Sequence, residues 1–196
     1  PGAIRFQGRA LRSALGFRRT GSFAFVHSSV LQPESASLRG PRPFMTTEPR
    51  KILAISSGGG HWVQMLRVLP AFEGHEVVLA TVDEAYGVDA PGYELRVIPD
   101  ANRWNKWALL KSAWAIFRLL RSERPDVVLS TGAAPGFFAL RMGRLLGART
   151  IWLDSIANAE KLSLSGERIG PHADLWLTQW PHLAREDGPA HRGATL

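Results

Sequence analysis

Short apolar runs alternate with amphipathic helical patterns from residue 51 to residue 178. The apolar runs predict strands at 51–56, 75–81, 95–98, 126–130, 149–153 and 174–178. The patterns between them predict helices at 62–69, 104–121 and 136–146. Strands that are apolar along their whole length are typical of a parallel sheet covered on both faces. The sequence therefore predicts a Rossmann-like α/β fold, with a mainly parallel sheet and helices on both faces.

Residues 1–44 do not continue this pattern. They contain seven arginines and one acidic residue, Glu34, without a sustained helical or alternating period. The first methionine is Met45, shortly before the first predicted strand. We expect residues 1–44 to be a disordered or non-native extension, with an organelle transit peptide as the less favoured alternative. We expect residues 45–196 to form a single domain.

The net charge of +7 lies almost entirely in this extension, so the predicted domain is close to neutral. No nucleic-acid-binding surface is therefore expected. The chain has no cysteine, which excludes a disulfide framework, a cysteine-based zinc site and a thiolate nucleophile, and is compatible with a reducing cytoplasm. No apolar stretch is long enough to span a bilayer, so any membrane attachment would be peripheral.

A glycine-rich loop separates the first predicted strand from the helix that follows it. Three glycines allow close approach of a ligand to the backbone, and a helix N-terminus favours phosphate. The residues predicted to bind a diphosphate here are Ser57, Gly58, Gly59 and Gly60. A tight turn that only packs strand against helix is the alternative. His61 follows directly, either as a general base or as a residue that caps or orients the loop.

The same loop leaves a nucleotide cofactor as a second interpretation. Asp83 lies 23 residues after Gly60, near the spacing of a ribose-binding acid, although Val63 stands where a dinucleotide fingerprint needs a small residue. Because no Lys-Ser or Lys-Thr pair follows the glycines, the loop is not a Walker motif.

Two further predicted strands also end in unusual loops. Thr131, Gly132 and Ala133 follow the fourth strand and precede a helix, which predicts a second backbone cradle for the diphosphate. Asp154 follows the fifth strand, either as a catalytic or sugar-binding group or as a turn or cap residue. Ligands of open parallel sheets bind at the carboxyl ends of strands, so all three loops are candidate sites.

The predicted helix at 104–121 has two distinct faces. Leu109, Ala113, Ile116 and Leu120 follow the spacing of a buried stripe. Another face combines aromatic and cationic residues, a pairing suited to the headgroup region of an anionic membrane. Its predicted membrane contacts are Trp104, Trp107, Lys111, Trp114, Arg118 and Arg121. The alternative is that the tryptophans fill a core or a partner interface while the cations are solvated.

With these motifs in place, residues 51–196 resemble the acceptor-binding, membrane-associated subunit of the two-part dolichol-linked N-acetylglucosaminyltransferase, and its bacterial PssD-type relatives in exopolysaccharide synthesis. The likeness is carried by segments 56–61, 130–135, 152–155, 162–166, 173–175 and 179–181. Two positions depart from the family pattern. Asp154 stands where relatives often have Glu, and Asn158 where they often have Arg.

The resemblance implies the N-terminal half of a GT-B glycosyltransferase that is inactive alone. A small partner subunit would hold the UDP-sugar, and this chain would bind a polyprenyl-diphosphate-linked acceptor at the cytoplasmic membrane face. The transferred sugar would be of the N-acetylglucosamine or glucuronic acid type. His61 and Asp154 are the candidate catalytic residues, and no cofactor or metal is expected. Eukaryotic relatives usually carry an N-terminal membrane anchor, which residues 1–44 do not resemble, so the bacterial type fits better.

Two other classes of function remain open at this point. One is an NAD(P)- or flavin-dependent oxidoreductase that uses Gly58, Gly60 and Asp83. The other is a non-catalytic membrane scaffold that recruits a transferase through the tryptophan-rich helix.

Overall fold

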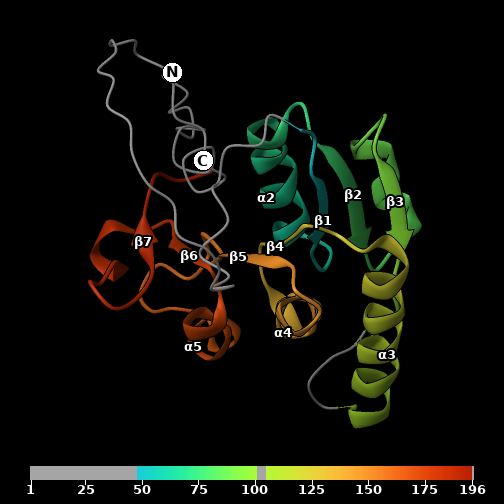
Figure 1. Ribbon diagram of the computed structural model, residues 1–196. Helices are drawn as coiled ribbons and strands as arrows, with labels where there is room; N and C mark the ends of the chain where they lie inside the picture. Colours follow the sequence, from blue (N-terminus) through green and yellow to red (C-terminus); the bar gives the residue numbers. More distant parts are fainter. Residues whose placement is uncertain (1–47, 101–104, 196) are drawn as a thin grey trace, which may run out of the picture.

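Seven parallel strands form one sheet in the order β3-β2-β1-β4-β5-β6-β7 (Figure 1). The computed structural model describes residues 48–100 and 105–195, so the predicted extension 1–44 and Trp104 lie outside the described residues. The strands are β1 (Lys51–Ile55), β2 (Glu76–Thr81), β3 (Glu94–Val97), β4 (Val127–Ser130), β5 (Arg149–Leu153), β6 (Leu175–Thr178) and β7 (Ala190–His191). The predicted parallel sheet is confirmed.

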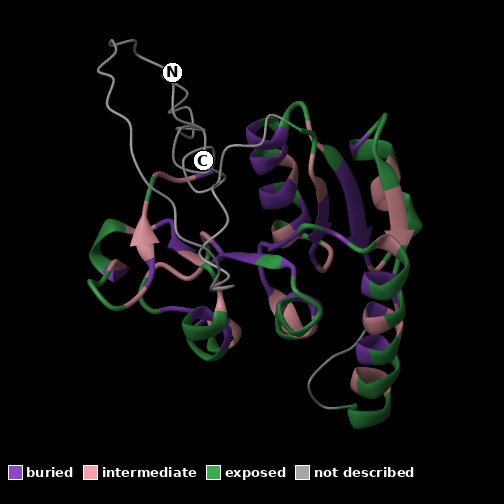
Figure 2. Ribbon diagram, viewed as in Figure 1, coloured by how far each residue is buried: buried purple, intermediate pink, exposed green. Residues whose placement is uncertain are grey.

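Helices cover both faces of this sheet, as predicted. α2 (Gly60–Val68) and the following 3-10 turn η1 (Leu69–Phe72) pack on one face, where Trp62, Met65 and Phe72 are buried against β1 and β2. α3 (Lys106–Glu123), α4 (Ala133–Leu145) and α5 (Leu164–Ile169) pack on the other. Figure 2 shows that the central strands are mostly buried, whereas the helices and the edge strands β3 and β7 are partly exposed.

Alternation along the central strand explains the two cores. Ile52 and Ala54 of β1 belong to the cluster under α2, whereas Leu53 and Ile55 belong to the cluster under α3 and α4. All four are completely buried, because both faces of a parallel sheet are covered. Burial on both faces therefore explains why residues 52–55 are all apolar.

Some short elements depart from the predicted pattern. α4 begins at Ala133 instead of residue 136, because Pro135 is compatible with the first turn of a helix. α5, β7 and the 3-10 turns η2 (Glu84–Asp89), η3 (Gly170–His172) and η4 (Pro181–Leu183) were not predicted. Each spans six residues or fewer, too short to show a period in the sequence.

An ion-pair network fastens the amino-terminal edge of the sheet to the end of α3. The Glu123 carboxylate lies 2.8 Å from Lys51 Nζ and 3.0 Å from Arg96 Nε. The hydrogen bonds that Lys51 donates to Glu123 and Glu76 raise the pKa of Lys51 to about 12. The hydrogen bond from Lys51 is the main cause that lowers the pKa of Glu123.

Candidate functional site

The two glycine-containing loops meet where the strand order reverses. β1 lies between β2 and β4, so the chain turns one way after β1 and the other way after β4. Open α/β sheets bind their ligands in the crevice at this switch point, at the carboxyl ends of the strands. The loop after β1 leads into α2 and the loop after β4 leads into α4, on opposite faces.

His61 and Thr131 tie the two loops together. His61 Nδ1 lies 3.0 Å from the Thr131 carbonyl oxygen, and the Thr131 hydroxyl donates to the His61 carbonyl at 2.8 Å. A carbonyl oxygen can only accept, so the proton of the neutral imidazole sits on Nδ1. Nε2 is then unprotonated and able to accept a proton. His61 does not cap α2, whose N-cap is Gly59, but its hydrogen bonds orient the loop. A role as general base stays a prediction.

Gly132 leaves room for this imidazole. A Cβ at Gly132 would lie 2.4 Å from His61 Cε1, and the Gly132 φ of 141° is unfavourable for other residues. The next residue, Ala133, also has a positive φ of 64°. Such backbone strain is found preferentially at functional sites, where the surrounding structure maintains it.

Backbone donors are available at both helix N-termini. Within the described part of the chain, the N–H groups of Gly60, His61 and Ala133 have no protein acceptor. α2 and α4 also direct their positive dipole ends toward this edge. An anion such as a diphosphate is the ligand that such an arrangement suits.

The three glycines of the first loop have different surroundings in the structure. A Cβ at Gly58 would collide with the Tyr86 ring, so packing accounts for that glycine. Gly59 has a φ of 65°, which a side chain disfavours. Gly60 has open space around its Cβ position, so no protein neighbour explains it. Ser57 lies half-buried in the same loop.

Asp154 is buried and its carboxylate is already bonded. Oδ2 accepts from the Ser163 N–H at 2.8 Å, and Oδ1 accepts from the Ser163 hydroxyl at 2.5 Å. Ser163 in turn caps α5. Asp154 has an exposed fraction of 1%, which fits a structural turn or cap residue. A catalytic role for Asp154 stays a prediction, and these contacts do not favour it.

Asp83 caps the turn that follows β2. Its carboxylate accepts from the Ala85 N–H at 2.9 Å and so caps η2. The following turn carries Tyr86 onto the glycine loop, where the phenol oxygen accepts from the Gly59 N–H at 2.8 Å. Asp83 therefore has a structural role at this turn.

A buried polar cluster behind the site was not foreseen. The Asp154 carbonyl accepts from the side-chain amides of Gln64 and Gln179, at 3.3 and 2.9 Å. Gln179 Oε1 accepts from the N–H and the hydroxyl of Thr195, both at 2.8 Å. The cluster joins α2, β5, β6 and the C-terminal segment. Asp154 and Gln179 lie in segments that carry the family likeness, but no pattern in the sequence indicates that they meet Gln64.

The two predicted faces of α3 are present. Ala113, Ile116 and Leu120 are buried, Leu109 is half-buried, and Lys111, Arg118 and Arg121 are exposed. Trp107 and Trp114 have exposed fractions of 82% and 62%, so neither fills the core. An apolar groove of about 680 Å³ runs along this face. It is lined by Trp107, Leu110, Lys111, Ala113, Trp114, Phe117 and Met142.

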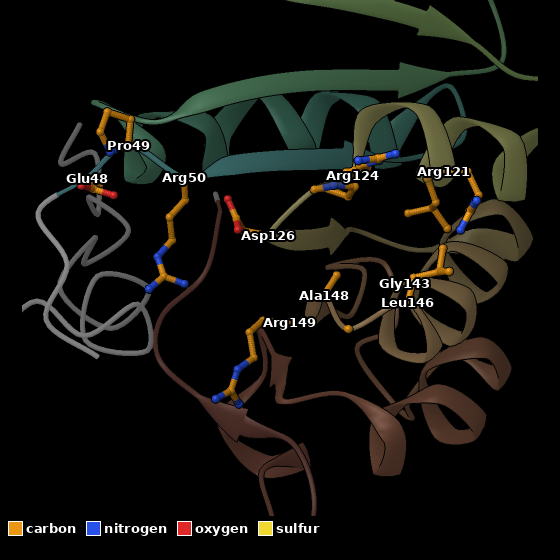
Figure 3. Close-up of a pocket in the computed structure, with 13 residues that line it drawn as sticks. Glu48, Pro49, Arg50, Arg121, Arg124, Asp126, Gly143, Leu146, Ala148 and Arg149 are labelled. Atoms are coloured by element: carbon orange, nitrogen blue, oxygen red, sulfur yellow. The ribbon is translucent and has the colours of Figure 1, made fainter. Parts of the chain in front are cut away.

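A larger hollow, of about 1000 Å³, lies at the opposite edge of the sheet (Figure 3). Arg50, Arg121, Arg124 and Arg149 line it together with Asp126. α3 and α4 both end there, and helix C-termini carry partial negative charge. The positive charges of these arginines can offset the partial negative charge at the ends of α3 and α4. The described residues that line the hollow include no helix N-terminus of the kind found at the glycine loops.

Residues 48–100 and 105–195 contain neither a candidate metal site nor a candidate membrane-spanning helix. No three His, Asp or Glu side chains gather there as a metal site would require. In the same ranges, no helix has the length and apolar character needed to cross a bilayer.

Comparison with known proteins identifies the class. Residues 58–185 match the family model of the glycosyl transferase 4-like domain. The UDP-N-acetylglucosamine transferase subunit ALG14 of Eremothecium gossypii is 30% identical over 189 residues, covering 80% of this chain and 81% of the relative. The human and mouse subunits of the same name are 29% and 27% identical and cover 71% and 74% of this chain. In these two alignments, 81% of the human and 82% of the mouse subunit are matched.

Solved structures agree on the fold. MurG of Acinetobacter baumannii superposes with a TM-score of 0.61 at 15% identity, covering 73% of this chain and 45% of MurG. A UDP-N-acetylglucosamine 2-epimerase of Rickettsia bellii gives 0.58 at 14% identity, covering 76% of this chain and 46% of that one. The chain thus spans less than half of these two proteins, and the predicted GT-B half is confirmed. It belongs to the glycosyl transferase 4-like family and, within it, to the UDP-N-acetylglucosamine transferase subunits of the ALG14 type.

Proposed function

We propose that this chain is the acceptor-binding subunit of a two-component transferase that moves N-acetylglucosamine from UDP-N-acetylglucosamine to a polyprenyl-diphosphate-linked acceptor. The names of the relatives favour N-acetylglucosamine over the glucuronic acid alternative. A separate small subunit supplies the donor site, and the word subunit in the names of the relatives supports this division. The observation that carries the proposal is the pairing of His61 with Thr131 between two helix N-termini.

The acceptor diphosphate lies against the two glycine-containing loops. Its contacts are Ser57, Gly58, Gly59, Gly60, Thr131, Gly132 and Ala133. The unpaired N–H groups of Gly60, His61 and Ala133 support this position. Oriented backbone donors neutralise part of the phosphate charge, so no metal or other cofactor is needed in this half of the enzyme.

His61 acts as the general base. Nε2 takes the proton of the acceptor hydroxyl as its oxygen forms a bond to the anomeric carbon of the donor sugar. The bond between that carbon and UDP breaks, and UDP leaves with the electron pair, so the configuration inverts. The hydrogen bond from Nδ1 to Thr131 supports this role, since it holds the tautomer and the ring orientation.

α3 places the subunit on the cytoplasmic face of the membrane. Trp107 and Trp114 enter the headgroup region, while Lys111, Arg118 and Arg121 attract anionic lipids. Trp104, outside the described residues, belongs to the same predicted face. The exposed tryptophans and the apolar groove beside them support a membrane over a core role. Attachment through α3 brings the acceptor to the loops.

The deciding experiment measures transfer from radiolabelled UDP-N-acetylglucosamine to a polyprenyl-diphosphate-linked acceptor in vesicles. Wild-type chain, donor subunit and their mixture are compared, and the His61→Gln chain is mixed with the donor subunit as the fourth sample. Product from the mixture alone, strongly reduced by His61→Gln, supports the proposal. Full activity with the variant would support a scaffold that takes no part in the chemistry.

A further inference from the structure

Tyr86 stands over the first glycine loop although it comes from a different part of the chain. It lies in η2, after β2, and its ring fills the space beside Gly58. The phenol oxygen accepts from the Gly59 N–H at 2.8 Å. The hydroxyl therefore occupies the place next to α2 where a phosphate oxygen would approach.

The hydroxyl has a proton left to donate. A phenol can accept and donate at the same time, and its lone pair is used by Gly59. Among the described residues no acceptor takes the phenol proton. Polarisation by the Gly59 N–H strengthens the donor, because hydrogen bonds in a chain reinforce one another.

Contacts between η2 and α2 hold Tyr86 in this position. Its ring centroid is 5.5 Å from that of Trp62, and the Trp62 indole donates to Asp89 at 3.2 Å. Asp83 caps the start of the same turn. The phenol is thus placed by packing before any ligand arrives, which lowers the entropy cost of using it.

Two buried hydroxyls at the same edge also lack partners. Ser56 and Thr81 come directly after Ile55 and Ala80, the last pair of the β1–β2 ladder. Ser56 precedes the glycine loop, and Thr81 precedes η2. Both are completely buried, and no described residue bonds to either hydroxyl. Alternation along the strands puts both on the α2 side of the sheet, the side against which Tyr86 also packs. Buried polar groups without a protein partner point to a bound polar molecule.

From these observations we infer that Tyr86 is a binding residue that donates its phenol proton to the acceptor phosphate at the glycine loop. The inference rests on the proposed diphosphate site and adds to it a side-chain ligand that the sequence pattern does not indicate. Tyr86 binds and positions the phosphate and takes no part in the proton transfer at His61.

Tyr86→Phe tests this role, because it removes only the hydroxyl and keeps the ring against Gly58 and Trp62. Inorganic pyrophosphate is the probe, and its binding to the full chain is measured by calorimetry. We expect about ten-fold weaker binding, as for a hydrogen bond to a charged group. In the reconstituted enzyme, KM for the acceptor should rise about ten-fold with little change in kcat.

Tyr93→Phe is the matched control, because Tyr86 and Tyr93 are the only tyrosines and Tyr93 is exposed. It should bind pyrophosphate as wild type does. Equal or tighter binding by Tyr86→Phe, with an unchanged unfolding temperature, would overturn the inference; tighter binding would show that the hydroxyl obstructs the site. If the wild-type chain itself does not bind pyrophosphate, that result contradicts the proposed diphosphate site, and with it the role of Tyr86.

Discussion

His61 Nδ1 lies 3.0 Å from the carbonyl oxygen of Thr131, a residue 70 positions further along the chain. The contact joins the loop after β1 to the loop after β4 and sets the imidazole tautomer. It also leaves Nε2 unprotonated at the edge of the sheet where the strand order reverses. The proposed chemistry depends on this contact more than on any single motif.

His61→Gln should lower kcat of the reconstituted transferase by about 10²- to 10⁴-fold, the usual contribution of a general base. KM for the acceptor should change much less, because glutamine can still donate to Thr131. Steady-state kinetics of the two-subunit enzyme provide the measurement. His172→Gln is the control, since that histidine is exposed near the opposite edge of the sheet. Equal losses in both variants would contradict the role of His61.

Gly60→Ala separates ligand binding from packing in the first loop. No protein atom lies within 4 Å of the added Cβ, and alanine favours helix over glycine by about 1 kcal/mol. We therefore expect equal or greater thermal stability together with a higher KM for the acceptor. Gly58→Ala, which would press on Tyr86, should instead destabilise the fold. A Gly60→Ala enzyme with wild-type KM would favour the packing interpretation of the loop.

Asp154→Asn tests whether this buried carboxylate is structural. Asparagine cannot accept from both the backbone and the hydroxyl of Ser163 with the same strength, so unfolding should become easier by about 1–3 kcal/mol. Ser163→Ala should show a similar loss in chemical denaturation. If Asp154→Asn abolished transfer while the free energy of unfolding stayed the same, Asp154 would be catalytic after all.

Glu123→Gln should reduce the free energy of unfolding by about 1 kcal/mol at neutral pH, since it breaks the contacts to Lys51 and Arg96. The pKa of Glu123 is lowered in the folded chain. Its contribution is therefore present above the unfolded-state pKa and is lost as pH falls through the lowered value. Denaturation of wild type and variant should thus converge in acid. Exposed Glu186→Gln is the control, and a pH-independent difference would exclude this cause.

The double variant Trp107→Ala/Trp114→Ala should bind vesicles of anionic phospholipid much more weakly than wild type. Lys111→Gln alone should weaken binding by about 1 kcal/mol, and added salt should diminish that difference. Vesicle co-sedimentation measures both effects. Arg168→Gln, at an exposed position of α5, should bind as wild type does. Wild-type binding by the double tryptophan variant would contradict membrane contact through α3.

The long elements could be predicted because packing against a core requires apolar residues at regular intervals along the sequence. β1 is apolar at every core position, and α3 repeats its buried residues at helical spacing. α5 and η2 were missed because a turn or two has too few residues to establish a period. Capping by Ser163 and Asp83 becomes visible only when their partners are known.

The candidate site was only partly predictable. Glycines after a strand and before a helix indicated both loops, because chain order and helix polarity suffice to place an anion there. The contacts of Tyr86 with Gly59, and of Gln64 with Asp154, join segments far apart in the sequence. No local pattern encodes such pairs. Asp154 allowed two interpretations in the sequence, because no local pattern encodes its contact with Ser163.

The central claim is that this chain is one half of a transferase and contributes the acceptor site. The most direct measurement is N-acetylglucosamine transfer to a polyprenyl-diphosphate-linked acceptor by the chain alone, by the donor subunit alone and by both together. The account predicts product only when both subunits are present. Transfer by this chain alone, or none with both subunits at any donor concentration, would contradict it.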